Sequence, residues 1–235
     1  MLRIISKAVA LLTIFCISVS TTFGGNVSGK VNFKGTSPSM PMIKMNADPK
    51  CVKMHSGKDV SSEQAVINAN KTLRWVFVYV KKGLEGKKFP TPTTKVSIDQ
   101  KGCMYTPHVF GVMAKQPIEI TNSDATLHNI HALPKTNTGF NIAQPKQGMK
   151  MTKTFDKPEM PVKIKCEVHN WMASYAYVMD NPFFAVTDDK GNFEIKNLPD
   201  GNYTLEAWHE KYGTQEMNVS VKGGAATADF TFEAK

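Results

Sequence analysis

The sequence predicts an all-β protein built from β-sandwiches, and three observations point there. Segments such as "NVSGKVNF" alternate polar and apolar residues, as a strand does when one face is buried and the other meets solvent. Others, such as "RWVFVYV" from Arg74 to Val80, are rich in aromatic and β-branched residues and suit a strand buried on both faces. Pro, Gly and Asn separate these short segments, and helical periodicity is at most weak, around "SSEQAVINA".

Two further strands complete this pattern in the middle of the chain. "QPIEITN" opens with Pro117 and closes with Asn122, so it has a turn residue near each end. "PVKIKCEV" places Val162, Ile164 and Cys166 on one face and its lysines on the other. This second strand therefore directs a cysteine toward the same side as the core residues.

Residues 1–24 have the layout of a secretory signal peptide. Arg3 and Lys7 precede an apolar run from Ala8 to Val19, and small residues follow it. The run is short for a bilayer span, although a retained membrane anchor is the alternative. We therefore expect a periplasmic or secreted protein with no membrane span after the signal is removed.

The charge of the chain bears on its partners. Its 29 Lys and Arg exceed its 20 Asp and Glu, which gives a formal net charge of +9. The signal peptide carries two of the basic residues and no acidic ones, so the mature chain carries +7. This balance favours an acidic partner through long-range steering, whereas export and the lack of a basic-aromatic cluster argue against nucleic acid.

Export also changes the interpretation of the cysteines. Removal of the signal peptide leaves three, Cys51, Cys103 and Cys166, which is an odd number for an oxidising compartment. Cys166 stands in "KCEVHNWM", where His169 and Met172 follow it at intervals of three residues. A thiolate, an imidazole and a thioether together suit copper, while the plain alternative is a buried cysteine and a packing methionine on a strand.

A blue-copper site needs a second histidine, and "SDATLHNIHALP" supplies His128 directly after the strand "PIEITN". The pair of motifs "HNIH" and "CEVHNWM" resembles the cupredoxins, in particular their amicyanin-like and plastocyanin-like members, over roughly Val76 to Val178. The resemblance implies a Greek-key β-sandwich that binds one type 1 copper ion. This sequence departs from the family pattern at Glu167 and Trp171. The resemblance therefore does not imply the colour or the reduction potential of the site.

Carried over position by position, the resemblance implies a ligand set and its surroundings. His128, Cys166 and His169 would be the equatorial ligands and Met172 the axial one. Asn129 would tie the two ligand loops together by hydrogen bonds. His131 is expected in the core or beside the ligands rather than on the metal, and His169 is expected near the surface as the exit for electrons.

The C-terminal part of the chain shows a second theme beyond "MDNPFF". Turns at "DKG" and "LPDG" flank strands such as "NYTLEAW", and the stretch from Ala185 to Gly213 resembles carboxypeptidase regulatory-like, transthyretin-like modules. We therefore expect a copper domain at 25–181 and a small transthyretin-like sandwich at 182–235. The early strand also resembles this module, so 25–35 pairing with the C-terminal strands is the alternative. His209 is expected to be a surface or structural residue of the module.

Cys51 and Cys103 leave two possibilities open. A disulfide would join the N-terminal segment to the sandwich. The spacing of His55 after Cys51 and of His108 after Cys103 also permits a Cys₂His₂ metal site. The methionines nearby resemble some Cu(I)-handling segments, although packing is the simpler role: Met40, Met42, Met45 and Met54.

These features favour a carrier of single electrons over an enzyme, because the predicted copper ligands leave no open position for a substrate. A copper oxidoreductase subunit is the less favoured alternative, since the sequence has no His-x-His pair and no histidine directly beside Cys166. Copper delivery or binding to the cell envelope is the other alternative.

Overall fold

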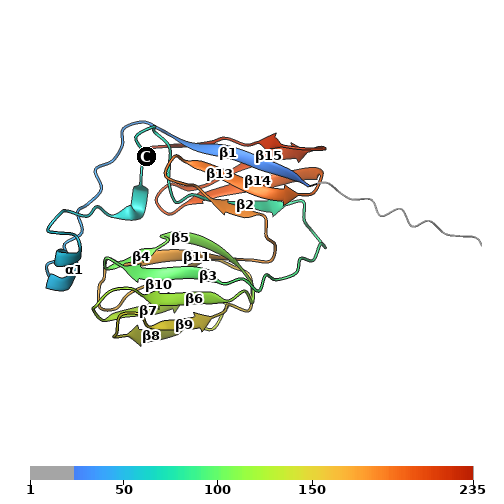
Figure 1. The fold of residues 1–235 in the computed structure, drawn as a ribbon. Coiled ribbons are helices and arrows are strands. Elements are labelled where there is room, and N and C mark those ends of the chain that lie inside the picture. The colour runs from blue at the N-terminus through green and yellow to red at the C-terminus, as the bar shows by residue number, and fades with distance from the viewer. Residues whose placement is uncertain (1–23, 235) are drawn as a thin grey trace, which may run out of the picture.

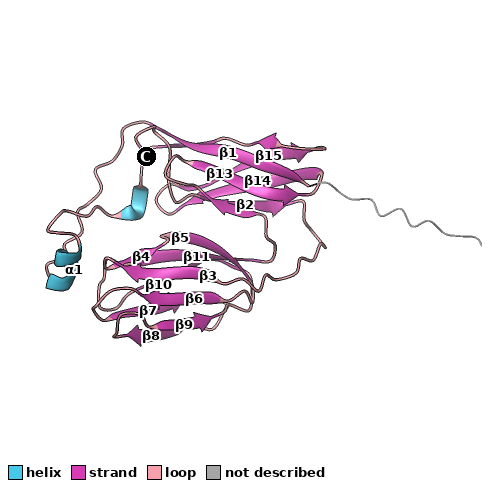
Figure 2. Cartoon of the chain, viewed as in Figure 1, coloured by secondary structure: helices cyan, strands magenta, loops and turns pink. Residues whose placement is uncertain are grey.

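The computed structural model describes residues 24–234, which form two β-sandwiches side by side (Figure 1). Strands make up nearly all of the regular structure (Figure 2), so the predicted all-β class is confirmed. The predicted signal peptide lies outside the described residues, apart from Gly24. Between residues 24 and 234 no helix has the length and apolar character needed to cross a membrane.

The first sandwich contains the predicted copper ligands, and we call it the ligand sandwich. Its strands are β3 (Val96–Lys101), β4 (Met104–Thr106), β5 (Val109–Met113), β6 (Ile118–Asn122), β7 (His128–Leu133), β8 (Phe140–Gln144), β9 (Lys150–Lys153), β10 (Glu159–Lys165) and β11 (Ala173–Met179). One sheet has the order β5-β11-β10-β7-β8, and the other has the order β4-β3-β6-β9. Alternating apolar residues such as Ile98, Ile120, Ile130 and Ile164 fill the space between the sheets.

The second sandwich, which we call the C-terminal sandwich, joins the two ends of the chain. Its strands are β1 (Gly25–Lys34), β2 (Phe77–Lys82), β12 (Phe184–Val186), β13 (Asn192–Leu198), β14 (Gly201–His209), β15 (Gly213–Val221), β16 (Ala226–Thr227) and β17 (Phe230–Glu233). β1 lies between β13 and β16 and also pairs with β17, and the facing sheet has the order β12-β2-β14-β15. The C-terminal sandwich therefore takes one strand, β1, from the N-terminal end of the described residues.

The strand pairing departs from the sequence boundaries, which placed residues 25–181 in the copper domain. β1 and β2 both pair with strands of the C-terminal sandwich, so the ligand sandwich begins only after β2. The predicted burial of β2 on both faces explains this placement. Val78 and Val80 enter the core of the C-terminal sandwich, and Phe77 and Tyr79 face the ligand sandwich.

Aromatic side chains form the contact between the two sandwiches. The Phe77 ring stacks on Tyr177 of β11 with 4.0 Å between centroids, and Phe184 and Trp208 pack around the pair. Phe77 and Tyr177 are almost completely buried. Apolar burial of this kind holds the sandwiches in a fixed relation.

The long connection from β1 to β2 crosses the end of the ligand sandwich and carries a helix that the sequence analysis did not predict. Helix α1 (Pro49–Met54) begins after Asp48, whose carboxylate accepts from Lys50 N at 2.8 Å, and Pro49 occupies the first turn. Six residues are too few to show a helical period. A 3₁₀ turn, η1 (Glu63–Ala65), stands at the weakly helical "SSEQAVINA".

Candidate metal centre

Two neighbouring strands bring the predicted ligands to one end of the ligand sandwich. His128 is the first residue of β7, and Cys166 directly follows β10. β7 and β10 run antiparallel, with His131 opposite Lys165, so the start of one lies beside the end of the other. His169 and Met172 lie in the short loop from β10 to β11.

The ligand atoms of three residues converge in a buried space. Nδ1 of His128 lies 3.0 Å from Nδ1 of His169, which lies 3.9 Å from Sγ of Cys166. The donor atoms of the three residues all lie within 4.8 Å of one another, and each residue is at most 2% exposed. Two imidazoles and one thiolate at this spacing fit a single copper ion.

Hydrogen bonds within the loop hold Met172 beside this set. Met172 N donates to His169 O at 3.0 Å, and Cys166 N donates to Met172 O at 3.3 Å. His169 N in turn donates to Cys166 Sγ at 3.4 Å, as backbone groups do around a thiolate. Met172 itself is completely buried. These hydrogen bonds thus close the segment "CEVHNWM" into a compact loop around Cys166.

A carboxylate faces the outer nitrogen of each candidate ligand histidine, and neither carboxylate was predicted from the sequence. Asp124 Oδ2 lies 2.9 Å from Nε2 of His128, and Asp48 Oδ2 lies 3.1 Å from Nε2 of His169. Such partners fix the tautomer and the ring orientation of a ligand histidine. Asp124 stands four residues before His128 and could have been found there. Asp48 is 121 residues from His169, and no local pattern connects them.

These contacts set the protonation of the ligands. Burial alone would lower the pKa of His128, but Asp124 and the Cys166 sulfur raise it to about 9. Burial would raise the pKa of the Cys166 thiol, but hydrogen bonds from His128 and the backbone lower it overall. Burial lowers the pKa of His169. In the metal-free protein His128 is therefore protonated at neutral pH, and the pKa values of Cys166 and His169 both lie below their ordinary values.

Asn129 connects the two ligand loops. Its side-chain oxygen accepts from Glu167 N, and its backbone oxygen accepts from the Tyr105 hydroxyl. His131 takes a different role from Asn129, because its Nδ1 lies 2.5 Å from the Glu167 carboxylate and its ring is partly exposed. His131 is thus outside the core and near the ligand loop.

His169 does not lie near the surface, so that expectation was wrong. The side chain is 2% exposed, and the connection before β2 covers it. Cys51 Sγ lies 3.5 Å from Nε2 of His169, on the same side as Asp48. The loop position of His169 suggested exposure, and no local sequence pattern indicates that a segment more than a hundred residues away covers it.

The remaining predicted residues have structural roles. Cys51 and Cys103 form a disulfide, and among the described residues no group of possible metal ligands includes His55 or His108. His55 Nε2 lies 2.7 Å from Gly102 O, and His108 Nε2 lies 3.1 Å from the Glu210 carboxylate.

The methionine cluster of the sequence does not form one site. Met40 packs on the core of the C-terminal sandwich, Met45 is buried in the ligand sandwich, and Met42 is exposed. His209 is a structural residue of the C-terminal sandwich, where it packs on Tyr212, and burial lowers its pKa to about 4.

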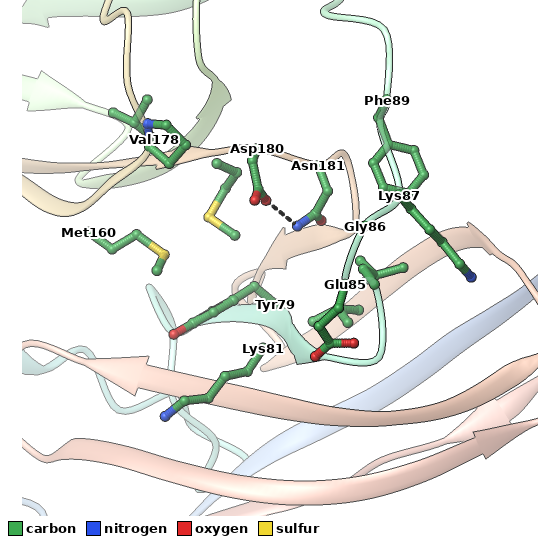
Figure 3. A pocket seen from close by; sticks show the side chains of 14 residues that line it. Tyr79, Lys81, Glu85, Gly86, Lys87, Phe89, Met160, Val178, Asp180 and Asn181 are labelled. Atoms are coloured by element: carbon green, nitrogen blue, oxygen red, sulfur yellow. Dashed lines mark hydrogen bonds between the residues drawn. The ribbon is translucent and has the colours of Figure 1, made fainter.

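A pocket of about 270 Å³ lies where the two sandwiches meet, and it is separate from this centre. Figure 3 shows Tyr79 and Lys81 on one side of it and Met160 and Asp180 on the other. None of the residues that line it is a candidate ligand. The metal centre is therefore defined by the converging donor atoms and not by an open cavity.

Comparison with known proteins gives a family for one part of the chain. Residues 180–233 match the family model of the carboxypeptidase regulatory-like domain. No curated protein matches the chain in sequence.

Three solved structures illustrate the structural matches. A copper-containing nitrite reductase from Thermus scotoductus SA-01 has 20% identity over 41% of this chain and 24% of its own, at a TM-score of 0.33. A purple cupredoxin from Nitrosopumilus maritimus has 19% identity over 36% of this chain and 99% of its own, at a TM-score of 0.31. An amicyanin variant has 18% identity over 36% and 82%, at a TM-score of 0.32.

The chain thus spans about a quarter of the nitrite reductase. At these TM-scores the structural matches carry no argument about the site, which rests on its own geometry. Residues 180–233 of this chain are thus similar to a carboxypeptidase regulatory-like domain.

Proposed function

We propose that this protein is an exported type 1 copper protein that carries single electrons between redox partners. The observation that supports the proposal is the convergence of Nδ1 of His128, Sγ of Cys166 and Nδ1 of His169 in one buried space. Copper bound there would supply a one-electron couple, Cu(II) and Cu(I), because thiolate and imidazole together accept both oxidation states.

The residues around the candidate copper centre make the ligand loop rigid and keep water away from the ligand atoms. The loop from Cys166 to Met172 is closed by its own hydrogen bonds, and Asn129 ties it to β7. A site that changes little between two oxidation states suits electron transfer, whereas a catalyst needs room for a substrate. The burial of all four predicted ligands supports the carrier over the enzyme.

The charge of the chain supports an acidic redox partner. The net charge of +7 that remains after removal of the predicted signal peptide would steer such a partner toward the protein, with a rate that falls as ionic strength rises. The proposal therefore includes an encounter that is faster at low salt.

Copper titration of the metal-free protein tests the proposal. We expect one Cu(II) per chain, an intense visible charge-transfer band from the Cys166 thiolate and a matching paramagnetic resonance spectrum. Cys166→Ser and His128→Gln should each abolish the band. His131→Gln is the matched control, because His131 is near the loop but faces Glu167, and it should keep the band.

Other outcomes would favour the alternatives. A protein that binds only Cu(I) and stays colourless would support copper delivery or envelope binding. Steady turnover of nitrite or oxygen by the pure protein would support an enzyme. A band that survives Cys166→Ser would mean that the site is assigned to the wrong residues.

A further inference from the structure

The connection between β1 and β2 covers the candidate copper centre, and we call its residues 43–60 the lid segment. Ile43, Met45, Val52 and Val60 pack against the core of the ligand sandwich, and the disulfide from Cys51 to Cys103 ties the segment to it. Ile43 N also donates to Val60 O at 2.8 Å, which closes the segment on itself. The lid segment is thus a fixed part of the wall around His169.

Asp48 and Cys51 are residues of the lid segment that reach His169, and Asp48 brings a carboxylate there. One carboxylate oxygen accepts from Lys50 N at 2.8 Å, at the start of α1. The other lies 3.0 Å from the Thr126 hydroxyl and 3.1 Å from Nε2 of His169. Three contacts from three segments fix the direction of this carboxylate, and its side chain is only 20% exposed.

This geometry specifies which nitrogen of His169 carries the hydrogen. A carboxylate accepts hydrogen bonds, so Nε2 carries the hydrogen and Nδ1 keeps its lone pair. Nδ1 is the atom that faces His128 and Cys166. The ring is therefore held, before any metal binds, with its free nitrogen toward the position where the ligand atoms converge.

We propose that Asp48 is a positioning residue of the copper centre, which acts through His169 and also supplies a negative charge at its edge. This inference rests on the proposed function. It goes beyond the four predicted ligands, because it assigns a role to a residue of the covering segment. A negative charge near the ion stabilises Cu(II) relative to Cu(I) and thus lowers the reduction potential.

The first test uses the metal-free protein and does not depend on copper. Nitrogen-15 NMR of the imidazoles should show His169 as the Nε2–H tautomer in the wild-type protein. Because His128 can also donate to Nδ1 of His169, the comparison is made in a His128→Ala background, which should keep the Nε2–H form of His169. Adding Asp48→Ala to that background should give a mixture of tautomers. A wild-type His169 that carries its hydrogen on Nδ1 would overturn the proposal, whatever the protein does with copper.

The second test measures the reduction potential of the copper-loaded protein. Asp48→Asn keeps a good helix N-cap but removes the charge, and it should shift the redox equilibrium toward Cu(I) by about tenfold, or about 59 mV for one electron. Asp59→Asn makes the same change in net charge at an exposed position of the lid segment and should leave the potential nearly unchanged.

The two proposals fail in different ways. Equal potentials in Asp48→Asn and Asp59→Asn, with the blue band intact, would overturn the role of Asp48 and leave the copper function standing. If copper-loaded wild-type protein shows no charge-transfer band, the proposed copper function is wrong. The tautomer measurement would still decide whether Asp48 orients His169.

Discussion

Removal of the disulfide between Cys51 and Cys103 should destabilise the whole chain and uncover His169. The bond joins residues 52 apart in sequence, and the chain-entropy relation for such a loop gives about 4 kcal/mol at 25 °C. The closed loop contains β2, which belongs to the C-terminal sandwich, while Cys103 belongs to the ligand sandwich. The bond therefore restricts the unfolded state of a segment that links both sandwiches.

Urea unfolding of the metal-free protein, followed by tryptophan fluorescence and circular dichroism, measures this effect. The double variant Cys51→Ala and Cys103→Ala should lose about 4 kcal/mol of the free energy of unfolding. Wild-type protein reduced with dithiothreitol is the control, because it lacks the same bond and keeps both cysteine side chains.

The same variant should expose His169 to chemical modification. With the lid segment released, acylation of His169 by diethylpyrocarbonate should become faster than in the oxidised wild-type protein, where the ring is 2% exposed. A loss below about 1 kcal/mol, together with an unchanged rate at His169, would refute the reasoning. The apolar contacts of the lid segment would then hold it in place without the bond.

Three further outcomes follow from the structure. Copper affinity of the metal-free protein should rise about tenfold per pH unit from pH 7 until it levels near pH 9, because the pKa of His128 is about 9 and its proton must leave Nδ1. A flat affinity over this range in buffered competition titrations would contradict that pKa. Met172→Ala should keep copper bound but admit an added anion, whereas Met172→Leu should keep the site closed, and azide binding followed by absorption distinguishes them. Phe77→Ala should cost about 3–5 kcal/mol in urea unfolding, because its ring is fully buried between the sandwiches. Phe89→Ala is the control, because Phe89 is only partly buried, and it should lower the free energy of unfolding by less.

The sequence was sufficient to predict several of the strands and the grouping of His128, Cys166 and His169. Alternation along a strand depends on neighbouring residues, so "PVKIKCEV" predicts both its inner face and the direction of Cys166. The spacing of His169 and Met172 after Cys166 is equally local, because all three residues belong to one strand end and one loop. The affinity of thiolate, imidazole and thioether groups for copper is a property of the side chains themselves, so the sequence alone predicts that metal.

The tertiary structure decided what surrounds that centre and where each strand belongs. The apolar composition of β2 predicts burial on both faces, but only pairing with β12 and β14 shows which sandwich it completes. Asp48 has no sequence signal that relates it to His169, because the contact depends on a segment folded over the end of a distant sandwich. Burial of His169 follows from the same cause. Contacts between residues far apart in the chain depend on the packing of whole elements, and a single sequence carries no local pattern for them.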